Sequence, residues 1–135
     1  DWRMLMAWGE IVRLVEDSRM NFGIGLTGDK YTKASRVVYE GTTFYLLNPS
    51  SIKGPKTRLG KLLCMLHLAL HEVTHAFIGV HDEYFTIREG ELASVCADHL
   101  EKAIPHLLKV FEGKARPSWI EDTHVVENDY QRSLF

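Results

Sequence analysis

Residues 67–81 read HLALHEVTHAFIGVH and contain four of the seven histidines of this 135-residue chain. Within this run, His71, Glu72 and His75 form the pattern H-E-x-x-H, which places both histidines on the same face of a helix. Both imidazoles can therefore bind one metal ion, and Glu72 can accept a proton from a water that the metal activates. A third histidine, His81, follows Gly79, where the chain can turn back towards the same ion. The pattern is typical of zinc hydrolases.

The third histidine completes the ligand set of a catalytic zinc, which has three protein ligands and one open position. We therefore predict that Zn²⁺ is bound by His71, His75 and His81, with Glu72 as the general base. The alternative is that these are core histidines bonded to backbone carbonyls. His67 shares the helix face, but its Cα lies about 12 Å along the helix from that of His75. We interpret His67 as a buried polar residue or a partner of a ligand.

The spacing beyond the second histidine resembles that of one family. The segment from His71 to Phe85 resembles the WLM branch of the SprT-like metalloproteases, whose pattern is H-E-x-x-H-N-x-x-G-x-H-x-x-x-F. This chain departs from that pattern at Ala76, where the family has asparagine. A metzincin does not fit, because Gly79 comes four residues after the second histidine and no methionine follows His81.

The resemblance implies a compact zinc peptidase with the zincin fold. Some members of the group cleave proteins crosslinked to DNA or sumoylated proteins, and others are domains of larger modular proteins. The resemblance covers about fifteen residues, and the departure at Ala76 bears on the substrate class more than on zinc binding.

The composition is that of an ordinary globular protein, with 45% hydrophobic and 25% charged residues and a net charge of −2. We predict one domain over residues 1–135, cut from a longer chain because it begins with Asp1. The net charge gives no general reason to bind a polyanion. Cys64 and Cys96 are interpreted as buried free thiols of an intracellular protein, cytoplasmic or nuclear, although a single disulfide is an alternative.

The hydrophobic pattern predicts an α+β domain, a minimal zincin with a small sheet and a central active-site helix. Residues 62–80 are mostly apolar and near the length of a membrane span, but they carry Glu72 and three histidines, so a buried helix fits better. The expected elements are a helix over 2–17, strands over 21–27, 36–40 and 42–47 with a turn at Gly41, a helix over 57–78 ended by Gly79, and a helix over about 86–111 kinked or broken at Pro105.

Several other residues are candidates for the site. The strand over residues 42–47 is a candidate edge strand for an extended peptide substrate, and a core strand is an equal alternative. Asp82 and Glu83 are candidates to brace the ligating imidazoles, or else are solvated charges. An oxyanion-stabilising residue is not identified by the sequence, and the candidates are Tyr84, His106 and His124.

A basic cluster precedes the central helix and would suit phosphate groups, although basic connectors are usually just solvated. DNA is therefore a weakly supported partner of this domain. The cluster consists of Lys53, Lys56, Arg58 and Lys61.

The predicted function is a zinc-dependent endopeptidase that acts on a protein or peptide. One alternative is a non-catalytic, protease-like module that binds or regulates within a larger protein. The other is a zinc hydrolase of a non-peptide amide or ester. The pattern does not determine the oligomeric state.

Overall fold

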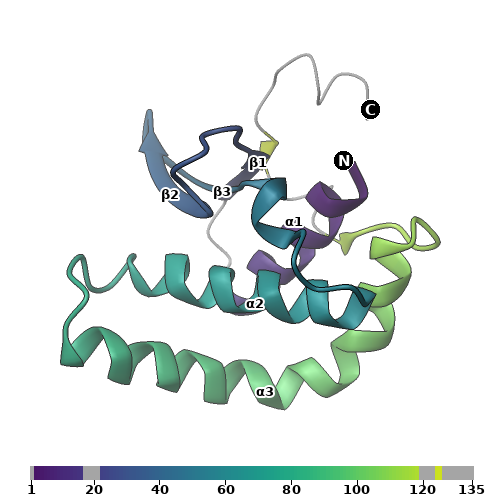
Figure 1. Cartoon of the computed structure of the whole chain (residues 1–135). Helices are drawn as coiled ribbons and strands as arrows, with labels where there is room; N and C mark the ends of the chain where they lie inside the picture. The colour runs from purple at the N-terminus through teal and green to yellow at the C-terminus, as the bar shows by residue number, and fades with distance from the viewer. Residues whose placement is uncertain (1, 17–21, 119–123, 126–135) are drawn as a thin grey trace.

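The structure is a computed structural model that describes residues 2–118, except 17–21, together with residues 124–125. Three helices and a small sheet make an α+β fold, which confirms the predicted class (Figure 1). In chain order the elements are α1 (Trp2–Glu16), β1 (Phe22–Leu26), β2 (Ala34–Tyr39), β3 (Thr42–Leu47), the short 3₁₀ helix η1 (Pro49–Ile52), α2 (Arg58–Thr74), α3 (Glu83–Phe111) and β4 (His124–Val125).

The sheet is mixed, with strand order β2-β3-β1-β4. Strand β1 runs parallel to β3 and β4, whereas β2 and β3 form an antiparallel hairpin. The hairpin turn has positive φ at both central residues, 49° at Glu40 and 80° at Gly41. Two such residues are what a two-residue type I′ turn requires, so the turn predicted at Gly41 is confirmed.

The prediction that residues 42–47 form an edge strand is wrong, because β3 lies between β2 and β1. The apolar strand β1 covers the second edge of β3, and the rings of Phe22 and Tyr45 pack edge to face with centroids 5.8 Å apart. The alternative interpretation of residues 42–47 as a core strand is confirmed by the burial of Tyr45 and Leu47. The edge strand next to β3 in the described sheet is β2.

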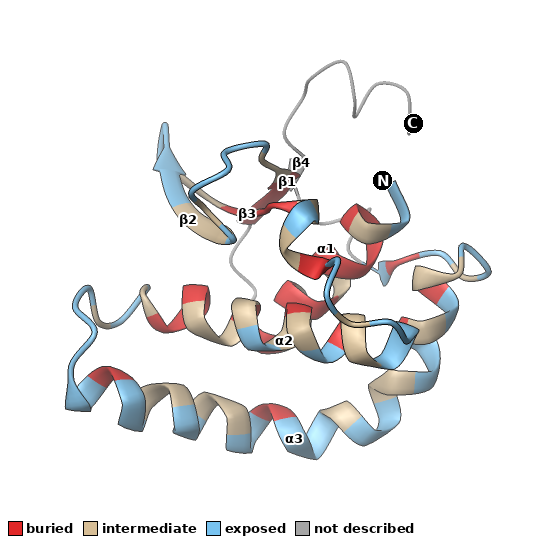
Figure 2. Cartoon of the chain, in the orientation of Figure 1, coloured by how far each residue is buried: buried red, intermediate tan, exposed pale blue. Residues whose placement is uncertain are grey.

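Buried side chains concentrate in α1 and in the inner strands (Figure 2). Leu5, Trp8 and Val12 of α1 are completely buried, and the Trp8 indole Nε1–H donates to the Tyr45 carbonyl oxygen at 3.0 Å. A buried indole needs such a partner, because an unpaired buried donor is costly. This hydrogen bond therefore fixes α1 against the centre of the sheet.

Helices α1 and α2 pack together between the sheet and α3, and α3 runs antiparallel to α2 (Figure 1). Thr57 caps its N-terminus, accepting a hydrogen bond from the backbone N–H of Gly60. The prediction that Gly79 ends this helix is wrong, since α2 ends at Thr74. Beyond that point the backbone N–H groups of Ala76 and Phe77 donate to the carbonyl oxygens three residues earlier, at Val73 and Thr74. These bonds tighten the chain into turns.

Helix α3 is continuous from Glu83 to Phe111 and contains Pro105. The helix bends in its C-terminal part (Figure 1). Proline has no backbone N–H to donate within the helix, and its ring crowds the preceding turn. Sharp helix bends are therefore found mostly at such residues. Of the two predicted alternatives at Pro105, the kink is therefore correct and the break is wrong, because the helix continues through this residue.

Cys64 and Cys96 do not form a disulfide; Cys96 is buried as predicted, whereas Cys64 is half-buried. Within the described residues, no helix combines the length and apolar character needed to cross a bilayer.

Candidate metal centre

The end of α2 and the loop that follows it bring three histidines together. His71 lies in the last turn of α2, His75 is the residue that caps its C-terminus, and His81 lies in the loop before α3. One ring nitrogen from each of the three can be chosen so that all lie within 4.8 Å of one another. His81 thus lies outside the helix, as predicted.

The spacing of these nitrogens suits a shared ion. The Nε2 atoms of His75 and His81 are 2.9 Å apart. Two nitrogens held by one tetrahedral zinc at its usual bond length are separated by about 3.4 Å. Small shifts of the side chains would therefore place both within bonding distance of a single cation. The three histidines form a group that could hold a metal ion.

The lowered pKa of His75 also favours metal binding. Burial lowers the pKa of His75 below its usual 6.5, and the neighbouring charges of His71 and His81 lower it further. Arg36 acts in the same direction. A neutral imidazole is the form that offers a lone pair to a metal.

Phe85 packs against all three histidines at once. Its ring centroid lies 5.0 Å from that of His71, and 4.9 Å from those of His75 and His81. Phe85 is buried, and its backbone N–H is bound by the side chain of Asp82, the residue that caps the N-terminus of α3. The first turn of α3 therefore restricts the orientation of every imidazole in the group.

Glu72 lies next to His71 in sequence and is buried, with only 9% of its surface exposed. Desolvation by burial raises the pKa of Glu72 to about 7. The backbone N–H of Arg36 on β2 donates to its carboxylate, and this bond and the Arg36 charge oppose the rise. A carboxyl with a pKa near neutrality is suited to accept and return a proton.

Two side chains beside this group were not found from the sequence. Glu89 on α3 lies with its Oε2 atom 3.4 Å from the Nδ1 atom of His71. Arg36 on β2 lies close enough to influence Glu72 and His75 electrostatically. Glu89 follows Phe85 by four residues, a helical spacing that was an available signal. No sequence signal pointed to Arg36, because only the packing of β2 against α2 brings it close to Glu72 and His75.

Other expectations for this region are corrected by the structure. His67 is exposed on α2 rather than buried, and it does not belong to the described metal group. Its side chain faces away from the core because α2 buries a different face. Asp82 does not brace an imidazole in the described structure but caps α3, and Glu83 is exposed in the first turn of that helix.

The candidates for an oxyanion-stabilising residue separate clearly. Tyr84 lies in the first turn of α3 next to Phe85, and its side chain is 72% exposed, so it stays a candidate on its position in the chain alone. His106 lies on the same helix 21 residues beyond Phe85, a distance of about 30 Å along the helix axis. That distance excludes His106. The side chain of His124 lies outside the described residues.

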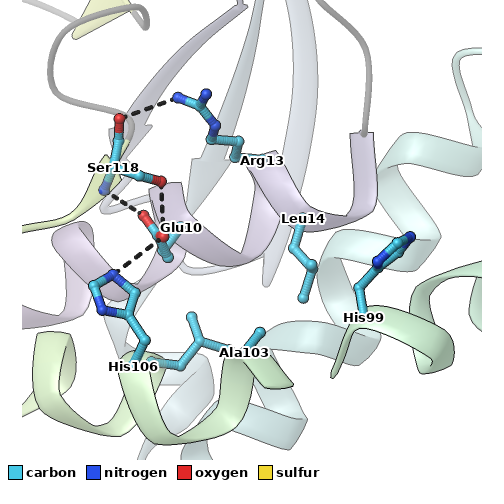
Figure 3. A pocket seen from close by; sticks show the side chains of 8 residues that line it. Glu10, Arg13, Leu14, His99, Ala103, His106 and Ser118 are labelled. Atoms are coloured by element: carbon cyan, nitrogen blue, oxygen red, sulfur yellow. Dashed lines mark hydrogen bonds and ion pairs between the residues drawn. The ribbon is translucent and has the colours of Figure 1, made fainter. Parts of the chain in front are cut away.

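His106 belongs instead to a cavity of about 280 Å³ between α1 and α3 (Figure 3). There Glu10 receives hydrogen bonds from the backbone N–H and the hydroxyl of Ser118, each 2.8 Å long. The Nε2 atom of His106 is 3.4 Å from the same carboxylate, and Arg13 donates to the Ser118 carbonyl. Glu10 thus holds the segment that follows α3 against α1.

The basic cluster lies at the opposite end of α2 from the histidines. Arg58 at the first residue of α2 is about 25 Å along the helix axis from His75. Arg58 forms an ion pair with Glu112 at 3.1 Å, and the Lys61 ammonium donates to the Ile52 carbonyl. These contacts favour a structural role over phosphate binding beside the histidines.

Comparisons with protein-family models, with curated proteins and with solved structures found no match for this chain.

Proposed function

We propose that this domain is a zinc-dependent endopeptidase related to the WLM branch of the SprT-like metalloproteases. The observation that carries the proposal is the convergence of three histidines beside a buried carboxyl. His71, His75 and His81 would hold the ion, and Glu72 would act as the general base. A purely structural zinc site usually has four protein ligands and no use for a carboxyl poised beside it.

The chemistry of the donor set fits zinc. Three imidazole nitrogens are borderline donors that suit a d¹⁰ ion with no strong geometric demand, and the lowered pKa of His75 favours the neutral form that binds such an ion. When bound, zinc would supply Lewis acidity that activates a water molecule and polarises the scissile carbonyl. The buried Glu89 oxygen beside His71 is the kind of acceptor that ligating histidines use for their second nitrogen.

Glu72 would carry the proton transfers. It would take a proton from water and pass that proton to the leaving amine, and its pKa, which burial raises to about 7 when no ion is bound, lies near neutrality. Burial shields the carboxylate from bulk solvent, and the Arg36 N–H holds it in place. Hydroxide attacks the carbonyl carbon, the C–N bond breaks, and the amine departs with the proton from Glu72.

A peptide substrate is favoured by the position of β2. This strand has no strand partner on its outer side among the described residues, and its residue Arg36 contacts Glu72 directly. An extended peptide adding to that edge would gain main-chain hydrogen bonds close to the general base. Two cavities of the described structure, one between α1 and α3 and one lined by Phe77 and Cys96, are not lined by the three histidines.

The test compares wild type with Glu72→Gln on an unfolded protein substrate, with zinc content measured in parallel and reactions run with and without DNA. Because the substituted amide keeps the shape of the side chain but cannot accept the proton, zinc should remain bound while the rate falls by about 10⁴ or more. His67→Ala is the matched control and should retain both zinc and activity.

Two outcomes would contradict the proposal. A wild type that binds zinc but cleaves no peptide under either condition would favour a binding module. Cleavage that persists unchanged in Glu72→Gln would place the base elsewhere.

A further inference from the structure

Glu89 occupies an unusual position on α3. Its Oε2 atom is buried and has no hydrogen-bond partner among the described residues, yet it lies 3.4 Å from Nδ1 of His71. A buried carboxylate oxygen without a partner is costly, so such an atom calls for an explanation. The geometry leaves the His71 ring as the group that this oxygen faces.

The neighbouring arginine does not neutralise Glu89. The Arg88 guanidinium lies over the Phe77 ring, 4.4 Å from its centroid, and pairs with Glu91 at 3.0 Å. Glu91 is thus the carboxylate that stabilises Arg88 on the outer side of the helix. Glu89, one helical turn after Phe85, points to the same cluster of rings that Phe85 contacts.

We propose that Glu89 is a positioning residue for the metal centre, which accepts a hydrogen bond from Nδ1–H of His71 and thereby leaves Nε2 of that ring to bind the ion. A neutral imidazole carries its proton on one nitrogen only, so an acceptor at Nδ1 selects the tautomer with a free lone pair at Nε2. The inference rests on the metal site of the proposed function and not on peptide hydrolysis.

The contact would act in two ways. It holds the ring plane of His71, and its negative charge makes the bound nitrogen a stronger donor. An exposed ion pair contributes little free energy because water screens it. The Glu89 oxygen that faces the ring is buried, so this contact is screened less. Phe85 restrains the same ring by packing, so α3 would hold His71 through one apolar and one polar contact.

The test measures zinc affinity by competition with a coloured chelator in Glu89→Ala and Glu89→Gln, with Glu91→Ala and Glu91→Gln as matched controls. Glu89→Ala should bind zinc about 10–100-fold more weakly, the usual loss when such a partner is removed. Glu89→Gln should fall between Glu89→Ala and wild type, because its amide oxygen still accepts a hydrogen bond without the charge. The Glu91 variants should match wild type.

A second readout separates positioning from a loss of folding. In zinc-loaded wild type, ¹⁵N NMR of the imidazoles should show His71 protonated at Nδ1, with a slowly exchanging proton that is lost in Glu89→Ala. Circular dichroism should show that all variants keep their helices. The inference is overturned if Glu89→Ala binds zinc as tightly as wild type, or if His71 binds the metal through Nδ1.

The two proposals fail differently. A protein that binds zinc in a Glu89-dependent manner but cleaves no peptide would retain this inference and contradict the endopeptidase proposal. A protein that cleaves peptide only when Glu72 is present, but binds zinc equally well without Glu89, would support the endopeptidase proposal and contradict this inference.

Discussion

At the scale of single residues, the chemistry of the site depends on what each side chain can donate or accept. His71, His75 and His81 offer nitrogen lone pairs from positions whose ligand atoms lie within 4.8 Å of one another. Glu72 differs from them because it is buried beside the group and its pKa is raised to about 7. A proton acceptor next to three candidate ligands is the combination that metal-assisted hydrolysis requires.

Replacement of each histidine tests the ligand set. His71→Ala, His75→Ala and His81→Ala should each lose stoichiometric zinc, because two remaining imidazoles bind the ion far more weakly. His67→Ala should retain it, since His67 is exposed on another part of α2. Metal content by mass spectrometry decides the matter. Full zinc in His81→Ala together with loss in His67→Ala would show that the third ligand is misassigned.

Phe85 provides a second test at this scale. Phe85→Ala removes a buried ring that contacts all three imidazoles, and core replacements of this kind cost about 3–5 kcal/mol of unfolding free energy. Phe85→Leu should cost less and still weaken zinc binding, because a smaller side chain leaves the imidazoles less restrained. Urea denaturation and chelator competition measure the two effects. Unchanged zinc affinity in both variants would show that the packing of this ring does not order the ligands.

At the scale of elements, three segments meet at the histidines: the end of α2, the loop over residues 75–82 and the start of α3. The loop is short, and both of its ends are fixed. Hydrogen bonds from Phe77 and Ile78 to the Thr74 carbonyl continue from α2, and Asp82 caps α3 through the Phe85 N–H. His81 immediately precedes that cap, so the start of α3 determines where the third histidine lies.

Removal of the cap tests this coupling. Asp82→Ala should destabilise the protein by about 0.5–2 kcal/mol, the usual cost of losing an N-cap side chain, and should weaken zinc binding through His81. Ser94→Ala is the control within the same helix, because Ser94 is exposed and its hydroxyl only bonds the Gly90 carbonyl. It should be nearly neutral in both assays. Equal effects of the two substitutions on zinc affinity would argue against the cap as an anchor of His81.

At the scale of the whole molecule, the candidate metal site lies where the sheet, α2 and α3 meet. Helix α2 lies between the sheet and α3, and the histidine group is completed by contacts from both: Arg36 from β2, and Phe85 and Glu89 from α3. A bound ion would therefore stabilise the entire fold. A ligand present at 100 times its dissociation constant adds about 2.7 kcal/mol to the free energy of unfolding. Zinc should raise the melting temperature, and a chelator should lower it.

His75 makes one contribution of definite sign to the pH dependence of the metal-free protein. Burial, followed by the charges of His71 and His81, holds the pKa of His75 below its unfolded value of 6.5. A depressed pKa contributes stability that is present above pH 6.5 and is lost as the pH falls through the folded-state value. On lowering the pH from about 7.5 to about 5.5, His75 should therefore destabilise the chelator-treated protein, whereas Glu72, whose pKa is raised to about 7, should stabilise it. The His75 contribution is measured as a difference: the melting temperature of wild type should fall relative to that of His75→Asn as the pH is lowered, and a constant difference would contradict the assignment.

The sequence alone determined the features that depend on local spacing. H-E-x-x-H places two imidazoles one helical turn apart, and the bounds of α1 and the turn at Gly41 also follow from neighbouring residues. Long-range packing decided the rest. The order of the strands made β2 rather than β3 the edge, and the antiparallel contact of α3 with α2 brought Glu89 to His71. No local pattern encodes such contacts, because they arise only when separate elements bury their apolar faces together.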